Sequence, residues 1–229
     1  MELLDNGIHT VEDWFSIAPP KMGESQWVDG RSAKELAKYV VASKGLVPEE
    51  IAQIIPNELF GDKKFKWFAE KITDFDEHFG SGEGRHHDML MMNDLVVLGI
   101  EAKADEPLDK TVGAWVNGDN RIKRINAMCN LIFGRDYKPE IDDELRYQLF
   151  SGLAGLLVEA RDNDIESAIF VILTIKVKGH YDDKNIERNE NDIAKFLSQK
   201  ELEYDKKTGR IRSYSKVKNI YIKHITIER

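Results

Sequence analysis

The stretch GRHHDMLMMNDLVVLGIEAK, residues 84–103, contains the pattern that decides the fold. Two short apolar runs flank the turn-forming pair Asn93 and Asp94, which is typical of a β-hairpin with buried strands. Side chains alternate along a strand, so Glu101 and Lys103 are expected to share one face of the sheet. The sequence therefore predicts a hairpin that carries charged side chains at the end opposite its turn.

The register of this hairpin decides which charged side chains meet. With a turn centred on the Asn-Asp pair, Asp88 lies opposite Gly99 and diagonal to Glu101. Diagonal neighbours lie ~7–8 Å apart, which is close enough for two carboxylates to share one cation. Because Gly99 has no side chain, we expect the cation to occupy the space above it.

Asp88, Glu101 and Lys103 lie in otherwise apolar strands, where an unpaired charge is costly to bury. Two carboxylates at this distance raise the pKa of one of them unless a cation intervenes. Mg²⁺, or Mn²⁺ in its place, takes oxygen ligands and completes its shell with water and phosphate. We expect Asp88 and Glu101 to bind this metal, with the carbonyl of Ala102 as a third ligand. Lys103 is then expected to orient the attacking water or to neutralise the transition state. A lysine paired with two acids at a strand end is the structural alternative.

The same residues resemble the motif of the PD-(D/E)XK nuclease superfamily, whose hairpin carries a metal-binding aspartate followed by an acid-x-lysine triplet. The matching positions are Asp88, Glu101, Ala102 and Lys103, and His87 replaces the usual proline.

The order of expected elements across residues 30–227 also resembles that superfamily, and residues 26–37 and 146–149 look like those of an uncharacterised bacterial family within it. The resemblance implies an α/β fold with a restriction endonuclease-like core, in which helices flank a mixed central β-sheet. It further implies a metal-dependent phosphodiesterase, an endonuclease-like hydrolase acting on DNA. A non-catalytic binding module that retains the nuclease scaffold is the alternative, and hydrolysis of RNA or of a small phosphoester is a third reading. Cutting both strands of a duplex favours a homodimer.

The chain is expected to divide into an N-terminal arm, residues 1–30, packed on an α/β domain of residues 31–229. Apolar spacing predicts helices at 32–43, 62–79, 108–116, 119–133, 143–160 and 191–203, with a glycine-rich break at 80–82. It predicts strands at 168–177 and 217–227, of which the first is buried on both faces, as in a parallel or mixed sheet.

Three further residues are accessory candidates. Glu35 sits where relatives in the superfamily add an acid, but Ser32 and Glu35 also match a capping box that serves only the helix. Gln148 falls on the apolar stripe of its helix, where it either reaches the charged cluster or forms a hydrogen bond in the core. His87 is expected to line the cleft. His86, His87 and Asp88 also match an HD phosphohydrolase, but that fold is all helical and the β-like run after Asp88 disfavours it.

Composition limits the class of protein. The 229 residues, 41% of them hydrophobic, suffice for one large domain, and they contain no run of 18 apolar residues. The acidic first residues lead us to expect no signal peptide. We therefore expect no membrane partner. The single cysteine, Cys129, excludes an internal disulfide, fits a cytoplasmic protein and is expected to be a buried thiol in a helix.

The net charge of −8 argues against indiscriminate coating of nucleic acid, yet positive charge is concentrated near the C-terminus. Residues 206–224 contain seven Lys or Arg and no acid. We call 206–224 the basic segment and expect it to follow a DNA backbone. A solvated face of a C-terminal hairpin explains the same pattern equally well. The candidate DNA-binding residues are Lys206, Lys207, Arg210, Arg212, Lys216 and Lys218.

Overall fold

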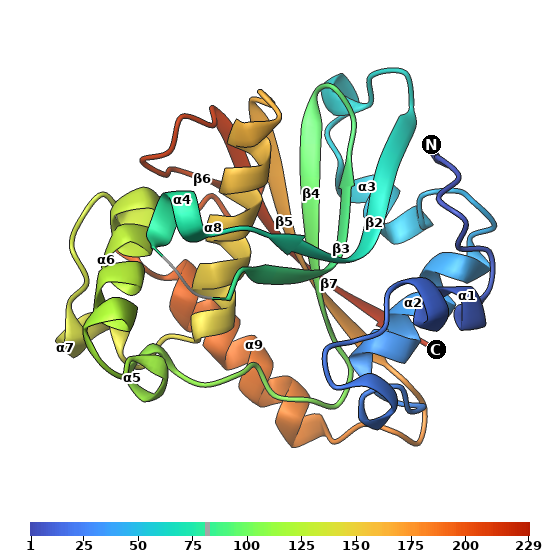
Figure 1. Ribbon diagram of the computed structural model, residues 1–229, viewed down its shortest axis with the longest axis horizontal. Helices are drawn as coiled ribbons and strands as arrows, with labels where there is room; N and C mark the ends of the chain where they lie inside the picture. Colours follow the sequence, from blue (N-terminus) through green and yellow to red (C-terminus); the bar gives the residue numbers. More distant parts are fainter. Residues whose placement is uncertain (81–82) are drawn as a thin grey trace.

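A computed structural model describes residues 1–80 and 83–229 of the chain. Within these residues a seven-stranded sheet has the order β1-β2-β3-β4-β5-β7-β6 (Figure 1). The strands are β1 (Glu2–Leu3), β2 (Lys64–Thr73), β3 (Arg85–Met92), β4 (Val96–Lys103), β5 (Ser167–Lys176), β6 (Arg210–Ile211) and β7 (Asn219–Glu228). β4, β5 and β7 run parallel, whereas β2, β3 and β4 form an antiparallel meander. The predicted mixed α/β sheet is confirmed.

Helices cover both faces of this sheet (Figure 1). They are α1 (Val11–Ile17), α2 (Ser32–Ala42), α3 (Glu49–Ile54), α4 (Asp76–Phe79), α5 (Val112–Trp115), α6 (Asp119–Phe133), α7 (Pro139–Asp142), α8 (Tyr147–Asp162) and α9 (Asp183–Leu197). One core packs α6 and α8 against side chains such as Leu90 and Phe170. The other packs α1 and α2 against the opposite face, where Leu98 and Val171 lie. β5 is buried on both faces, as its apolar run predicts.

The expected helix at 62–79 is wrong. Residues 64–73 form β2, and only 76–79 are helical, as α4. Phe65 and Trp67 are buried between exposed lysines, which is the alternation of a strand, whereas Phe68 and Ile72 are exposed. The helical spacing of the aromatic residues therefore obscured the two-residue alternation of buried and exposed side chains at the start of β2.

The other expected elements are largely confirmed, with shifted ends. The helices at 32–43 and 119–133 and the strands at 168–177 and 217–227 are found within two residues. The helix expected at 143–160 begins at Tyr147, the one at 191–203 spans 183–197, and only 112–115 of 108–116 is helical. Of the expected break at 80–82, residues 81–82 lie outside the described residues, while Gly80 ends α4 at φ 80°.

The expected arm contributes to the fold rather than lying on it. β1 pairs with β2 in parallel, and Trp14 of α1 is buried in the core beside Trp67. Among the described residues, no helix combines the length and the apolar character needed to span a bilayer.

The register of the hairpin differs from the expected one by two residues. Leu90, not Asp88, lies opposite Gly99, because the turn is centred on Asp94 and Leu95 rather than on Asn93 and Asp94. Its shape is fixed by Asn93, whose Oδ1 accepts hydrogen bonds from the amides of Leu95 and Val96 at 2.8 and 2.9 Å. Continuing this register places Asp88 directly opposite Glu101.

The space expected above Gly99 is filled. A Cβ at this position would lie 3.2 Å from both His87 Nδ1 and Leu156 Cδ1. The predicted cation therefore has no room above Gly99. The charged side chains lie at the open end of β3 and β4.

Candidate active site

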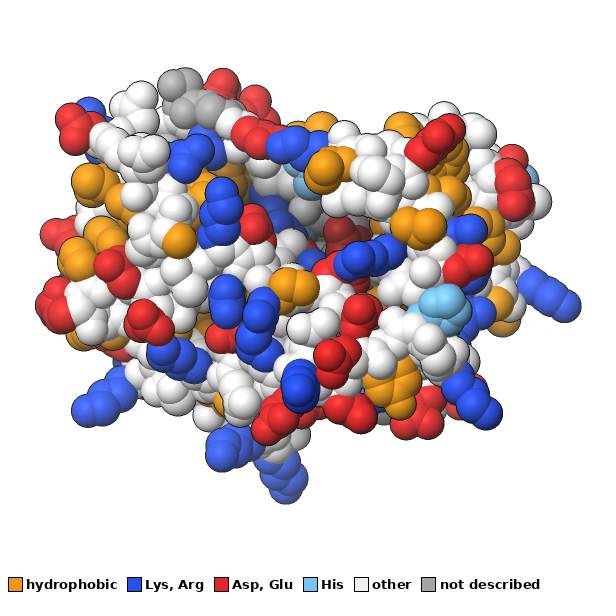
Figure 2. Space-filling view, turned by 90° about the horizontal axis from the view of Figure 1, so that it is seen from below, with side chains coloured by type: hydrophobic (Ala, Val, Ile, Leu, Met, Phe, Trp, Pro, Cys, Tyr) orange, Lys and Arg blue, Asp and Glu red, His pale blue; other side chains and the backbone are white. Residues whose placement is uncertain are grey.

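A cavity of about 850 Å³ opens at the carboxyl end of β4. Its walls come from β2, β3, the first turns of α2 and α8, and the loop that follows Lys103. Figure 2 shows this face of the molecule hollowed near its centre, with Lys and Arg side chains around the hollow. We call this cavity the cleft.

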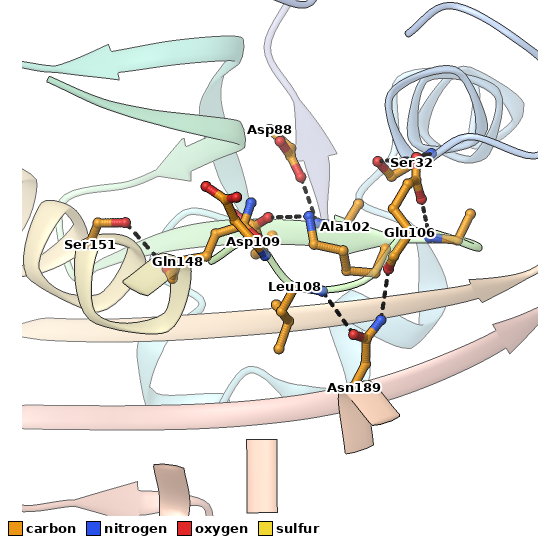
Figure 3. A network of polar contacts seen from close by, with 12 residues as sticks. Ser32, Asp88, Ala102, Glu106, Leu108, Asp109, Gln148, Ser151 and Asn189 are labelled. Carbon is orange, nitrogen blue, oxygen red and sulfur yellow. Dashed lines mark hydrogen bonds and ion pairs between the residues drawn. The ribbon is translucent and has the colours of Figure 1, made fainter. Parts of the chain in front are cut away.

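Asp88 lies where β3 leaves β4. The last paired residues of the two strands are Met89 and Ile100. Beyond them the backbone ladder is replaced by a side chain, since Asp88 Oδ2 accepts a hydrogen bond from the Ala102 amide at 2.7 Å (Figure 3). The strands therefore separate around the Asp88 carboxylate, which lines the cleft.

Glu70 is a functional candidate that the sequence reasoning missed. The neighbouring pairs of β2 and β3, Ala69 with Met89 and Lys71 with His87, place it opposite Asp88. Its φ of 47° is left-handed, which marks an irregularity in β2 at this point. Burial, and next the negative charge of Asp88, raise the pKa of Glu70 to about 8. Recognising 64–73 as a strand would have revealed this pairing.

Glu101 and Lys103 share one face of β4, as predicted, and are joined by a hydrogen-bonded ion pair of 2.7 Å. Glu101 is fully buried, and its other oxygen accepts a hydrogen bond from Arg85, which forms a second ion pair. Both oxygens therefore have cationic partners, and Glu101 is not in the wall of the cleft, whereas Lys103 is. Burial lowers the pKa of Lys103, and the charge of Asp88 opposes this shift.

The loop after β4 is held in place by a network of hydrogen bonds (Figure 3). Glu106 accepts hydrogen bonds from the amides of Ser32 and Ala104 at 2.9 and 3.1 Å. Asn189 of α9 accepts from the Leu108 amide at 2.8 Å and donates to the Glu106 carbonyl at 2.8 Å. These bonds join β4, α2 and α9 into one rim of the cleft.

Of the three accessory candidates, only Gln148 lines the cleft, where its Oε1 accepts from the Asp109 amide at 3.0 Å. His87 is buried between Gly99 and Gly155, and neither ring nitrogen has a hydrogen-bond partner among the described residues. It lies outside the cleft wall, contrary to expectation.

Glu35 also lies away from the cleft wall. Its Oε1 accepts hydrogen bonds from the Gly30 amide at 3.0 Å and from Lys38 at 2.7 Å. The capping-box expectation is wrong, because α2 is capped at Arg31 without a side-chain bond, and the Ser32 amide binds Glu106 instead.

The basic segment lies away from the cleft. β6 pairs with Tyr221 at the far edge of the sheet, three strands from β4 and level with Leu98. Strand spacings place it about 20 Å from Lys103. Arg212 and Lys218 form ion pairs with Glu203 and Glu166. In the described part of the chain, none of the six predicted DNA-binding residues lines the cleft.

Other cations occupy the cleft. Arg31, Lys110 and Arg188 line it from α2, the loop after β4 and α9. Across residues 1–80 and 83–229, no side-chain ion pair or hydrogen bond engages any of the three. They are free to contact a phosphate group.

A family model described as Domain of unknown function (DUF6946) matches residues 7–229, nearly the whole chain. The chain belongs to the DUF6946 family. Searches of curated proteins and of solved structures found no match. The description of the DUF6946 family names no activity. The side chains of the cleft are therefore the guide to the chemistry of this protein.

The cleft of this DUF6946 member offers oxygen ligands to a hard divalent cation. Glu70 and Asp88 both line the cleft, and burial, followed by the charge of Asp88, raises the pKa of Glu70, so a bound cation would favour its ionised form. Mg²⁺ commonly binds through one or two carboxylates together with phosphate and water. Within the described residues, no three His, Cys, Asp or Glu side chains form a complete metal cage. The residues fit a two-carboxylate site that a phosphate ligand completes.

Proposed function

We propose that this protein is a metal-dependent phosphodiesterase that cleaves DNA in the cleft. The observation that supports the proposal is the meeting of Asp88, Glu70 and Lys103 at the separated ends of β3 and β4, in a cavity with unpaired cations. An apolar side chain would pack at the position of Lys103 at least as well as a buried lysine does. A role in packing therefore does not explain why a lysine lies beside these carboxylates. The arrangement resembles the PD-(D/E)XK motif, to which Glu70 would add an acid.

Each residue has a separate task in this proposal. Asp88, Glu70 and the carbonyl of Ala102 would hold Mg²⁺ or Mn²⁺, and Glu101 would join them by exchanging Arg85 for the metal. When bound, the metal supplies charge stabilisation and a more acidic water. Lys103 donates hydrogen bonds to the attacking water or to the phosphate oxygens.

Substrate binding would use the rim of the cleft. Arg31, Lys110 and Arg188 hold the flanking phosphates, because each is unpaired and lines the cleft. The basic segment has no place in this arrangement, since it lies at the other edge of the sheet. The protein would then contact DNA through three scattered cations rather than one continuous stripe.

Nicking of supercoiled plasmid DNA in Mg²⁺ or Mn²⁺ tests the proposal. We expect the wild type to nick and Lys103→Ala to lose at least 100-fold in rate, within the range for a positioned proton donor. Lys223→Ala is the control, because Lys223 is a partly buried lysine whose pKa burial also lowers, but it bonds to the Thr208 carbonyl near the far edge of the sheet. Equal nicking by wild type and Lys103→Ala would remove the role assigned to Lys103.

A metal titration tests the site without relying on turnover. Saturating Mg²⁺ or Mn²⁺ should raise the melting temperature of the wild type by mass action and leave that of Asp88→Asn unchanged. The asparagine retains an oxygen for the Ala102 amide, so this variant removes the charge and keeps the hydrogen bond.

A non-catalytic binding module is the second candidate, and one observation favours it. Arg85 and Lys103 already satisfy both oxygens of Glu101, so the hairpin holds its charges without a metal. A protein that binds DNA with equal affinity in EDTA and in Mg²⁺, and shows no metal-dependent melting shift, would be this module.

A further inference from the structure

A second cavity of about 310 Å³ adjoins the cleft. The two share Glu83, Gly84 and Tyr147 in their walls, so Tyr147 stands at the boundary between them. The cavity is also lined by Trp115 of α5 and Arg121 of α6. We call it the aromatic pocket.

The aromatic pocket contains a stacked pair of rings. The centroids of Trp115 and Tyr147 lie 3.7 Å apart with an interplanar angle of 10°. Arg121 lies over the Trp115 ring at 5.1 Å and donates a hydrogen bond to the Trp115 carbonyl at 2.8 Å. Trp115 thus contacts both the Tyr147 ring and a cation.

Local structure holds this stack in place. A β-bridge joins Thr111 to Arg146, the residues that cap α5 and α8, and thereby brings the two helices together (Figure 1). Thr111 also accepts a hydrogen bond from the Ala114 amide. Trp115 ends α5 and Tyr147 begins α8, so the bridge supports both rings.

The charge of the aromatic pocket suits a polyanion. Arg121 is exposed, and the acid of the wall, Glu83, is already paired with Lys21. Arg124, at the base, donates hydrogen bonds to the carbonyls of Gly80 and Glu83 and is therefore not a phosphate ligand. An aromatic face next to an exposed arginine binds a nucleobase and its phosphate.

We propose that the aromatic pocket takes an unpaired nucleobase of single-stranded DNA whose backbone continues into the cleft. This inference rests on the proposed function for the identity of the ligand in the cleft. Both faces of a base inside a duplex are covered by its neighbours, so a protein ring stacks only on a base that has left the helix. The substrate is thus a strand with unpaired nucleotides beside the scissile phosphate, such as an overhang or a flap.

Binding in EDTA tests this inference apart from cleavage. Fluorescence anisotropy would compare the wild type on three probes: a single-stranded oligonucleotide, the blunt duplex of the same sequence, and a deoxyribose-phosphate strand of equal length without bases. We expect the single strand to bind best and the strand without bases to bind about 5- to 100-fold more weakly, since stacking contributes ~1–3 kcal/mol per base. Equal affinity for the strands with and without bases overturns the inference, whatever any variant does.

Variants locate the stacking surface. Tyr147→Phe retains the ring and should bind the single strand like the wild type, whereas Tyr147→Leu retains the apolar volume and should lose the preference for bases. Tyr214→Leu is the control, because Tyr214 also lies beneath an arginine, Arg212 at 5.4 Å, but in the basic segment. An equal loss in Tyr147→Phe and Tyr147→Leu, or a loss in Tyr214→Leu as large as in Tyr147→Leu, would also overturn it.

The two proposals fail in different ways. Plasmid nicking without base-dependent binding leaves the phosphodiesterase standing and removes the aromatic pocket as a base site. Base-dependent binding through Tyr147 without cleavage supports the pocket and removes the phosphodiesterase.

Discussion

Replacing Arg85 by Met removes one of the two cations that neutralise Glu101. Glu101 is fully buried, so it cannot recover the lost interaction from water. Breaking one side of a buried ion pair typically destabilises a protein by ~3–5 kcal/mol. Lys103 remains 2.7 Å from the other oxygen, which places the expected loss at the lower end, about 3 kcal/mol. For a chain of this length the melting temperature should fall by about 6–12 °C in EDTA.

Metal should reverse this loss if Glu101 is a latent ligand. Without Arg85 one oxygen of its carboxylate loses its cationic partner, and a divalent cation can replace the missing charge. At a concentration 100 times the dissociation constant, a bound metal contributes ~2.7 kcal/mol. Arg85→Met should therefore gain more stability from saturating Mn²⁺ than the wild type gains, as measured by thermal and urea unfolding.

Arg135→Met provides the matched control. Arg135 donates two 2.8 Å hydrogen bonds to the fully buried carboxylate of Asp142, so its removal should destabilise the protein by a similar amount. Asp142 lies outside the cleft wall, so Mn²⁺ should stabilise Arg135→Met only as much as it stabilises the wild type. Equal responses of the two variants to Mn²⁺ would refute the assignment of Glu101 to a metal site.

Three other outcomes are expected. Arg188→Ala should weaken DNA binding and reduce the salt dependence of the affinity by about one phosphate contact, whereas Lys206→Ala should change neither. Fluorescence anisotropy at several salt concentrations measures both quantities. A larger effect of Lys206→Ala would identify the basic segment as the DNA-binding surface. Burial lowers the pKa of His224 in the folded protein. Below about pH 6.5 the unfolded chain therefore binds a proton at His224 more readily than the folded protein does, so the free energy of unfolding should fall as the pH drops. The fall should be smaller in His224→Gln, as measured by urea unfolding at pH 5 and pH 7. Gly209→Ala should destabilise by ~1–3 kcal/mol, because φ is +73° and the Cβ would lie 2.7 Å from the Ile222 carbonyl oxygen; an unchanged urea midpoint would contradict this.

The hairpin and β5 could be predicted from the sequence because their apolar runs are short, β-rich and bounded by turn residues. The two-residue period of a strand places Glu101 and Lys103 on one face. This prediction remained correct because the register was wrong by two residues, an even shift that leaves each side chain on its face. The position of the turn depends on hydrogen bonds that Asn93 forms with its neighbours and with the Leu59 and Phe60 carbonyls. Contacts with a distant segment are not encoded in local spacing.

The cleft could be predicted only in part for a related reason. Phe65 and Phe68 fit a helical period, whereas Phe65 and Trp67 fit the period of a strand, and the helical interpretation concealed that Glu70 lies opposite Asp88. The basic segment was assigned to the cleft by its composition, but its position depends on strand order, which places β6 at the far edge. Arg85, the buried partner of Glu101, lies three residues before Asp88. Its ion pair with Glu101 depends on the pairing of β3 with β4, which local spacing does not give.

The contact between Arg85 and Glu101 also determines how a metal can enter. A buried carboxylate requires a counter-charge at all times, and Arg85 supplies it while the cleft holds no metal. A metal that binds Glu101 must therefore displace an arginine rather than fill a vacant position, which lowers its affinity for the free protein. A phosphate in the cleft changes this balance, because it attracts the displaced guanidinium and offers oxygen ligands to the metal. We therefore expect metal and DNA to bind cooperatively, each increasing the affinity of the protein for the other by the same factor.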